Sequence, residues 1–268
     1  MELHPRNQSF SWRDPSGPAR LLSEAQLQAY REIGGFVFEN ALTADEIDAV
    51  VQAIDPLEAQ AQEQLEQLSE GSVGIARAGE ITFSPHLVTR SPILKAFARH
   101  PLLVQLVTDL VGARPRLYWD QLVYKKPGTR DEFPWHQDNG YTFVEPQQYL
   151  TCWVALTDAN EANGCPWIVP GIHRQGTLAH RWTRLGFQCF ADHPDAVAMP
   201  VKKGSIAVFS SLTPHRTGPN LTADTRKSYI LQYTADGATM YPHNQAPIAA
   251  NNPGWQFLLV DDDAEALT

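Results

Sequence analysis

His136 and Asp138 stand two positions apart in the stretch Phe133–Tyr141, and together they could bind one metal ion. In an extended segment, residues i and i+2 project to the same face, so the imidazole and the carboxylate would share a face while Gln137 points away. One further imidazole would complete a set of two histidines and one carboxylate. Such a set leaves the opposite coordination face open, which suits Fe(II) in oxygen chemistry.

The His-x-Asp spacing is weak evidence by itself, because short patterns of common residues arise by chance. The chain contains nine histidines and carries a second copy of the pattern at His193 and Asp195. His136 could also be a surface histidine beside a turn, since Asn139-Gly140 is a turn signal. The rest of the chain must therefore decide between a metal site and a surface turn.

A third metal ligand is expected from His215, which closely follows a predicted strand at 205–210. It lies in a loop of turn-forming residues. Loop residues that a rigid sheet holds in place are common sites for ligands. The alternative is an ordinary surface histidine in the same loop.

Arg226 follows His215 eleven residues later, at the start of a predicted strand over 226–233. The loop between them turns back, so the two strands are expected to run antiparallel and to bring both residues close together. Every second residue from Arg226 to Gln232 shares one face, and this face is mainly polar. A polar face on a central strand predicts a polar cavity.

A guanidinium that is partly buried in such a cavity needs an anion, and its planar fork suits a carboxylate. The alternative for Arg226 is an ion pair with a carboxylate of the protein, such as Asp224 or Asp158. Thr217, shortly after the expected third ligand, could donate its hydroxyl into the same cavity. Trp153 is placed by its strand on the face of Thr151, although a single Trp is more often a core residue.

The elements that must position these residues begin with helices. Two capping-box patterns, at 23–26 and 43–46, open predicted helices, and Pro101 to Val111 is predicted as a third that ends before Gly112. From Arg116 onward, short runs of β-branched and aromatic residues predict strands at 117–124, 149–156, 167–169, 204–209 and 228–233. Helices first and strands afterwards predict a mainly β sandwich or barrel with helices packed outside.

We expect a single domain of 268 residues. The predicted parts are an N-terminal arm at 1–20, a mainly helical flank at 21–112, a β core at 113–235 with an insert at 171–198, and a C-terminal extension at 236–268.

Composition narrows the possible partners. The net charge of −9 argues against binding to nucleic acid or to an anionic membrane surface, both of which need a basic face. No apolar run approaches the length of a membrane span, and no secretory signal is visible at the start. Three cysteines without Cys-x-x-Cys spacing indicate a reducing compartment. A cytoplasmic protein with a small-molecule substrate is expected.

Several motifs, in chain order, resemble the phytanoyl-CoA dioxygenase family over roughly residues 25–235. They are His136-Gln137-Asp138, Trp153, Asn163-Gly164-Cys165, Pro170-Gly171-Ile172-His173, His215 and Arg226. Members of that family are Fe(II)- and 2-oxoglutarate-dependent oxygenases built on a double-stranded β-helix, a jelly-roll barrel. The resemblance therefore implies this fold, with Fe(II), 2-oxoglutarate and O2 as cofactor and cosubstrates.

The resemblance also implies residue roles. The iron ligands would be His136, Asp138 and His215. Arg226 would bind the distal carboxylate of 2-oxoglutarate, and the same site would include Thr217, Trp153 and Gln121. The copy at His193 and Asp195 falls outside the motif order, and His173 belongs to a structural turn, so neither is expected at the metal.

The implied reaction is hydroxylation of an unactivated C–H bond, with release of succinate and CO2. Related halogenases lack the carboxylate ligand, so the presence of Asp138 favours hydroxylation. We expect a small polar or natural-product substrate, with Asn139, Tyr141, Glu145 and Trp167 as candidate pocket residues. Two alternatives remain open, namely a zinc-dependent hydrolase that uses the same His/Asp/His site and a non-catalytic binding module on the same barrel.

Overall fold

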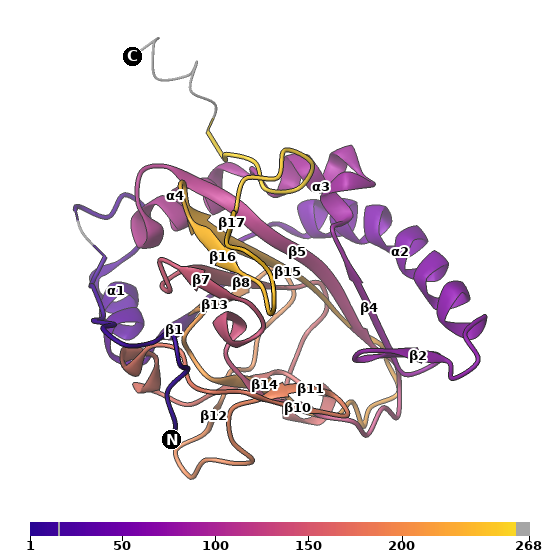
Figure 1. Ribbon diagram of the computed structural model, residues 1–268. Coiled ribbons are helices and arrows are strands. Elements are labelled where there is room, and N and C mark those ends of the chain that lie inside the picture. The colour runs from indigo at the N-terminus through magenta and orange to yellow at the C-terminus, as the bar shows by residue number, and fades with distance from the viewer. Residues whose placement is uncertain (16, 261–268) are drawn as a thin grey trace.

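An eight-stranded antiparallel sheet, the major sheet, forms the frame of the protein. The computed structural model describes residues 1–15 and 17–260 (Figure 1). In spatial order the strands are β1 (Gly35–Phe38), β13 (Ile206–Ser210), β8 (Leu150–Ala155), β15 (Arg226–Ala235), β5 (Pro115–Lys125), β4 (Ile81–Pro85), β3 (Ala76–Arg77) and β2 (Ser72–Val73). The expected strands of the β core are present, and the region 71–90 adds β2, β3 and β4 to one edge.

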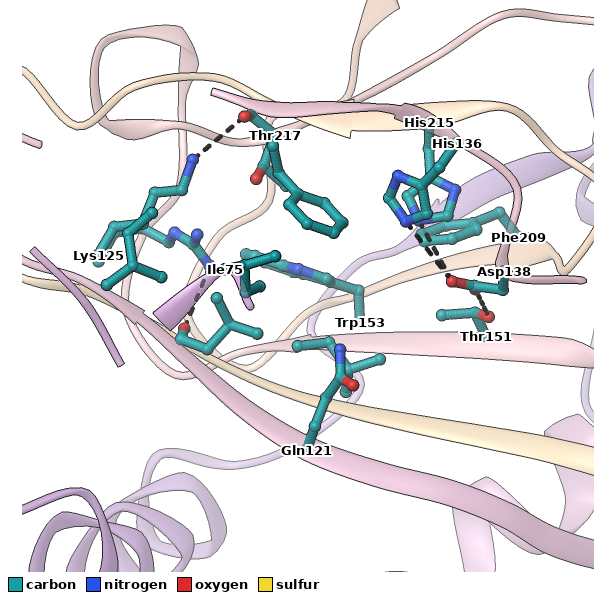
Figure 2. A pocket seen from close by; sticks show the side chains of 15 residues that line it. Ile75, Gln121, Lys125, His136, Asp138, Thr151, Trp153, Phe209, His215 and Thr217 are labelled. Atoms are coloured by element: carbon teal, nitrogen blue, oxygen red, sulfur yellow. Dashed lines mark hydrogen bonds and ion pairs between the residues drawn. The ribbon is translucent and has the colours of Figure 1, made fainter. Parts of the chain in front are cut away.

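A second, four-stranded sheet, the minor sheet, completes the barrel. Its order is β12 (Val197–Ala198), β9 (Pro166–Ile168), β14 (His215–Thr217) and β6 (Phe133–His136). Side chains of the minor sheet face those of the major sheet across the pocket in Figure 2. This arrangement confirms the predicted mainly β jelly-roll fold.

Four helices cover the outer face of the major sheet, as predicted (Figure 1). They are α1 (Glu24–Glu32), α2 (Ala44–Glu66), α3 (Pro92–Phe97) and α4 (Pro101–Val111). Short 3-10 turns are η1 (Leu87–Thr89), η2 (Asp138–Gly140), η3 (Glu161–Asn163) and η4 (Ile172–Gln175). Both predicted capping boxes are formed, by Ser23 with Gln26 and by Thr43 with Glu46.

The period-two alternation of the central strands divides the major sheet into two environments. Along β15, Tyr229 and Leu231 are fully buried and pack against the helices. The alternate residues Arg226 and Ser228 point to the opposite side, toward the minor sheet, and are also buried. One face of each central strand therefore builds the helix-covered core, and the other face builds a cavity.

The insert and the two terminal segments pack onto this frame. The last residues of the expected insert, Val197–Ala198, form β12 and pair with β9 in the minor sheet. Earlier in the insert lies a hairpin of β10 (Arg181–Thr183) and β11 (Gly186–Gln188). In the C-terminal extension, β16 (Thr239–Tyr241) and β17 (Ile248–Ala249) form a three-stranded sheet with β7 (Phe143–Glu145), while residues 261–268 lie outside the described residues.

The N-terminal arm is tied to the insert, since Leu3 forms a bridge with Leu178 and the side chain of Asn7 donates to the carbonyls of Gln175 and Thr177. Among the described residues, none of the helices combines the length and the apolar character that a bilayer crossing requires.

Gly34 joins α1 to β1 and supports the loop before β14. Its φ is +92°, and a Cβ at this position would lie 2.5 Å from Oγ1 of Thr213 and 2.6 Å from Nδ1 of His173. The hydroxyl of Thr213 donates to the carbonyl of Gly34 at 2.7 Å. Only glycine can satisfy both the backbone conformation and this close contact.

Asp120 is a buried carboxylate on the helix-covered face of β5. Its Oδ2 accepts hydrogen bonds from the hydroxyl of Tyr229 at 2.9 Å and from the backbone N–H of Val88 at 3.2 Å, whereas its buried Oδ1 has no partner among the described residues. Burial raises the pKa of Asp120 to about 6 despite these hydrogen bonds. The neutral form therefore stabilises the fold, and this contribution is lost as the pH rises through 6.

Asp120→Asn keeps an uncharged acceptor for Tyr229 and Val88. Between pH 4 and pH 7.5 the wild-type protein should lose about 2 kcal/mol of unfolding free energy that the variant retains. Urea unfolding at both pH values measures this difference. Asp195→Asn, a change at an exposed carboxylate, serves as the control, and equal pH profiles for wild type and Asp120→Asn would contradict the assignment.

Candidate metal centre and cosubstrate pocket

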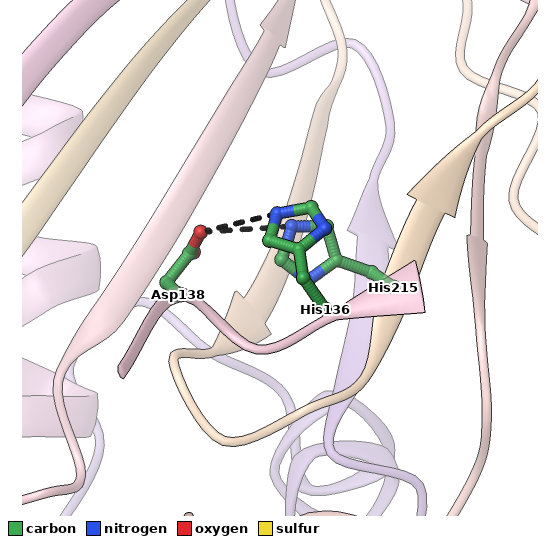
Figure 3. A group of neighbouring side chains, drawn as sticks. All are labelled: His136, Asp138 and His215. Carbon is green, nitrogen blue, oxygen red and sulfur yellow. Dashed lines mark ion pairs between the residues drawn. The ribbon is translucent and has the colours of Figure 1, made fainter. Parts of the chain in front are cut away.

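The side chains of His136, Asp138 and His215 point toward one another (Figure 3). His136 ends β6 and is the direct cross-strand partner of His215 at the start of β14, and Asp138 begins the 3-10 turn η2. The Nε2 atom of each histidine lies 3.7 Å from Oδ1 of Asp138, and all three ligand atoms lie within 4.8 Å of one another. Atoms bound at about 2.0–2.2 Å to one ion have comparable separations, so these three could hold a metal ion.

Backbone carbonyls orient both imidazoles for this role. Nδ1 of His136 lies 2.8 Å from the carbonyl of Pro134, and Nδ1 of His215 lies 3.0 Å from the carbonyl of Thr213. Since a carbonyl can only accept, each Nδ1 carries the proton and each Nε2 presents its lone pair to the shared centre.

The protonation states also suit metal binding. Burial opposes ionisation of Asp138, but the imidazoles of His215 and His136 and the donated hydroxyl of Thr151 hold its pKa below the ordinary value. Thr151 binds Oδ2, which leaves Oδ1 directed at the histidines. Burial, with a contribution from His136, lowers the pKa of His215 to about 4. At neutral pH the site therefore offers a carboxylate and a neutral imidazole.

Arg226 is fully buried and holds an incomplete set of hydrogen bonds. Its Nη1 donates to Oγ of Ser228 at 2.6 Å and to the carbonyl of Val123 at 3.4 Å. Its Nε and Nη2 are buried without a partner among the described residues. These two groups form one edge of the guanidinium, the edge that binds a carboxylate bidentately.

The pairing of Arg226 with a protein carboxylate, left open on the sequence, is not observed among the described residues. Asp158 instead accepts from Nζ of Lys202 and from the backbone N–H of Lys203. Burial lowers the pKa of Arg226 to about 10, so the group stays protonated at neutral pH. Its Cζ lies 5.2 Å from the centre of the Trp153 ring, which covers one face of the cation.

Lys125 is a second buried cation beside Arg226, its cross-strand partner. Its ammonium group donates to the carbonyl of Thr217 at 3.1 Å and also to that of Gly218. Burial and the neighbouring Arg226 lower its pKa. Lys125 was not among the residues predicted from the sequence, although the alternation along β5 places it on the same face of the strand as Gln121.

The inner pocket is a narrow space that runs from the three metal-binding side chains to the two cations. Its volume is about 60 Å³, room for about four waters. Figure 2 shows the metal-binding residues at one end, Lys125 and Thr217 at the other, and Trp153 between them. Gln121 reaches the pocket from β5. The inner pocket thus connects the guanidinium of Arg226 with the metal-binding side chains.

The outer cavity is a wider space, of about 550 Å³, that opens on the same metal-binding side chains. It is lined by residues of the hairpin β2–β3, of β5, and of the hairpin β10–β11. Tyr141, a candidate substrate residue, lines this cavity together with Gln121. The insert thus supplies one wall of the space in which a substrate would meet the metal.

The other three candidate substrate residues do not line the outer cavity. Asn139 is fully buried, and its amide bonds to Thr177 and to the backbone of Val144. Glu145 is exposed and accepts from Tyr241. Trp167 lies in β9 beneath the guanidinium of Arg216. Nearness in the sequence placed them beside the metal stretch, but the turn η2 and strand pairing direct them elsewhere.

Two further histidines stay apart from the metal-binding group, as expected. His193 and Asp195 face each other at 3.9 Å, with the carboxylate 80% exposed. His173 is buried at the turn η4, where its Nε2 contacts the carbonyl of Arg31. In the part of the chain that the structure describes, His136, Asp138 and His215 are the group of three such side chains that could hold an ion.

Comparison with known proteins finds relatives named as dioxygenases. The chain is 31% identical over 147 residues to phytanoyl-CoA dioxygenase of Arabidopsis thaliana, a match covering 52% of each chain, so it spans about half the length of that plant enzyme. It is 27% identical over 252 residues to ectoine dioxygenase of Bordetella parapertussis, covering 84% of this chain and 79% of the relative.

Among solved structures, the non-heme α-ketoglutarate-dependent carbocyclase SnoK from nogalamycin biosynthesis has the same fold. The TM-score is 0.72 at 23% identity, over 91% of this chain and all of the other (100%).

A sequence profile of the phytanoyl-CoA dioxygenase family matches residues 30–228, most of the chain and the range that contains His136, Asp138, His215 and Arg226. The family is described as phytanoyl-CoA dioxygenase, in agreement with the expected enzyme class, and His136, Asp138 and His215 could hold a metal ion. The chain therefore belongs to the phytanoyl-CoA dioxygenase (PhyH) family.

Proposed function

We propose that this protein hydroxylates an unactivated C–H bond of a small molecule, with Fe(II) bound by His136, Asp138 and His215. The overall reaction consumes the substrate, 2-oxoglutarate and O2, and it releases the hydroxylated product, succinate and CO2. One oxygen atom enters the new hydroxyl group and the other enters succinate. The C–H bond and the decarboxylation of the keto acid each supply two electrons.

The observation that carries this proposal is the unpaired edge of Arg226. A buried guanidinium with two unsatisfied N–H groups is costly unless an anion completes it. Arg226 lines the inner pocket that leads to the metal-binding side chains, and its Nε and Nη2 are buried without a partner among the described residues. A hydrolase that binds only a zinc ion would give this cation no partner, whereas a keto diacid that spans the pocket satisfies both ends.

The side chains divide the work among them. Bound iron, together with 2-oxoglutarate, supplies the activation of O2. His136 and His215 would hold the iron through Nε2, and Asp138 would supply the third protein ligand, the carboxylate that related halogenases lack. Thr151 fixes the carboxylate by binding its other oxygen. The outer cavity directs the substrate to the same centre.

The site draws on residues from Val73 in the β2–β3 hairpin to Gln232 near the end of β15. The helices hold the outer face of the same strands. We therefore propose that the described residues work as one catalytic domain, with the insert as part of the active-site wall.

Asp138→Ala removes the anionic ligand and should abolish succinate formation, because two neutral imidazoles alone bind Fe(II) weakly. The matched control is Asp195→Ala in the second His-x-Asp copy, which should retain wild-type turnover. Iron content after anaerobic loading and succinate release are measured for both variants, with circular dichroism as the check on folding. Wild-type activity in Asp138→Ala would show that the metal lies elsewhere.

Arg226→Lys keeps the charge but loses the bidentate fork. The KM for 2-oxoglutarate should rise about 10- to 100-fold, since a charge-assisted hydrogen bond contributes about 1.5–3 kcal/mol. Affinity for Fe(II) should change little, because the metal is bound at the other end of the pocket. Arg216→Lys, at an arginine paired with Glu132, is the control.

An unchanged 2-oxoglutarate requirement in Arg226→Lys would move the cosubstrate anchor away from Arg226. Two other outcomes bear on the whole proposal. Zinc retention with hydrolytic activity would favour a hydrolase. Ligand binding without succinate release, in protein loaded with Fe(II), would favour a binding module.

A further inference from the structure

We infer that the outer cavity selects an uncharged, ring-containing small molecule and rejects anionic substrates, including coenzyme A thioesters. The inference rests on the proposed function, because the cavity opens on the metal-binding side chains through His136 and Asp138. The side chains that line the cavity and their arrangement would decide which substrates can reach that centre.

Seven aromatic side chains line the outer cavity. They are Phe83, Tyr118, Trp119, Phe133, Tyr141, Tyr149 and Trp182. The rings of Phe133 and Tyr141 are nearly parallel, with an interplanar angle of 17° and a centroid distance of 6.3 Å. Trp182, on the β10–β11 hairpin, is 62% exposed at the cavity. Such rings offer stacking surfaces to a flat, ring-containing ligand.

A bulge in the major sheet adds one ring to this wall. Gln232 of β15 pairs with Trp119, but the next residue, Tyr233, pairs with Leu117. Tyr118 is therefore an extra residue on β5, and its side chain joins that of Trp119 at the cavity. Bulges of this kind commonly re-aim a side chain next to an active site.

Two glutamine amides are among the polar groups that line the cavity. Oε1 of Gln121 accepts from Nε1 of Trp119 at 2.7 Å, which orients the amide, and its nitrogen has no acceptor among the described residues. Gln232 is only 7% exposed, and its amide likewise has no partner there. An amide both donates and accepts, so these groups suit the hydroxyl, ether and carbonyl oxygens of a neutral molecule.

No lysine or arginine lines the outer cavity, and Asp138 is its one carboxylate, among the described residues. The cations of the site, Arg226 and Lys125, belong to the inner pocket. The flanking hairpins carry three arginines: Arg77 and Arg184 are paired with Asp131, and Arg181 donates to the side chain of Gln188. An anionic substrate group would lose hydration in this cavity without gaining a cationic partner from its lining.

The volume of about 550 Å³ agrees with this class of ligand, since drug-sized molecules occupy pockets of roughly 300–1,000 Å³. A flavanone glycoside, which has two ring systems and one sugar, is a suitable probe. Naringenin 7-O-glucoside is neutral, and naringenin 7-O-glucuronide differs from it only by a carboxylate in place of a hydroxymethyl group. Octanoyl-CoA tests whether the outer cavity can bind an acyl chain while the nucleotide of coenzyme A remains outside it.

Anaerobic calorimetry on protein loaded with Fe(II) and 2-oxoglutarate measures the binding of all three probes. We expect the glucoside to bind at least ten-fold more tightly than the glucuronide and octanoyl-CoA. Trp182→Ala should weaken glucoside binding about ten-fold. Leu221→Ala removes a side chain of matched exposure, 64% against 62%, outside the cavity lining, and should bind as wild type does.

Gln232→Lys supplies the cation that the cavity lacks, and it should shift the preference toward the glucuronide. Equal or tighter binding of the glucuronide or octanoyl-CoA by wild type, or no binding of the glucoside, would overturn the inference. The visible charge-transfer absorption of Fe(II) with 2-oxoglutarate is recorded first. If that absorption forms and the glucoside fails to bind, only the inference falls; if it does not form, the proposed function itself fails.

Discussion

A positive charge buried without its full set of acceptors governs the arrangement of this protein. Arg226 has no exposed surface, and its Nε and Nη2 have no partner among the described residues. The neighbouring Lys125 adds a second cation, but its ammonium group donates hydrogen bonds to backbone carbonyls. The field of the pocket is therefore positive at one end, while Asp138 is negative at the other. A carboxylate is therefore favoured beside Arg226, and a metal cation is favoured beside Asp138.

The barrel can keep such a polar interior because each central strand serves two environments. On β15, the residues that alternate with Arg226 form part of the large apolar core under the helices. That core provides the stability that offsets the burial of charged and polar groups on the other face. The cross-strand pair of His136 and His215 uses the minor sheet in the same way, since strand register alone brings the two imidazoles together.

The helix starts and the polar face of β15 were predictable from the sequence, whereas the residues of the cavity wall were not, for physical reasons. Period-two alternation gave the shared face of β15, and capping boxes gave the starts of two helices. The cavity wall was harder, because Tyr118 reaches it through a bulge that shifts register within one strand. Ile75 and Trp182 come from short hairpins whose pairing depends on tertiary contacts. Asn139 within η2 and Glu145 in β7 are close to the metal stretch in sequence, but neither lines the cavity.

Gly34 lies far from His215 along the chain, yet its carbonyl holds Thr213, whose own carbonyl orients that histidine. The space around its Cα is filled by Thr213 and His173. A side chain added at this helix–strand junction would push on the loop that presents the imidazole. Damage there would look, in any assay, like poor retention of iron rather than like a fault in the scaffold, so the origin of such a defect would be easy to misplace.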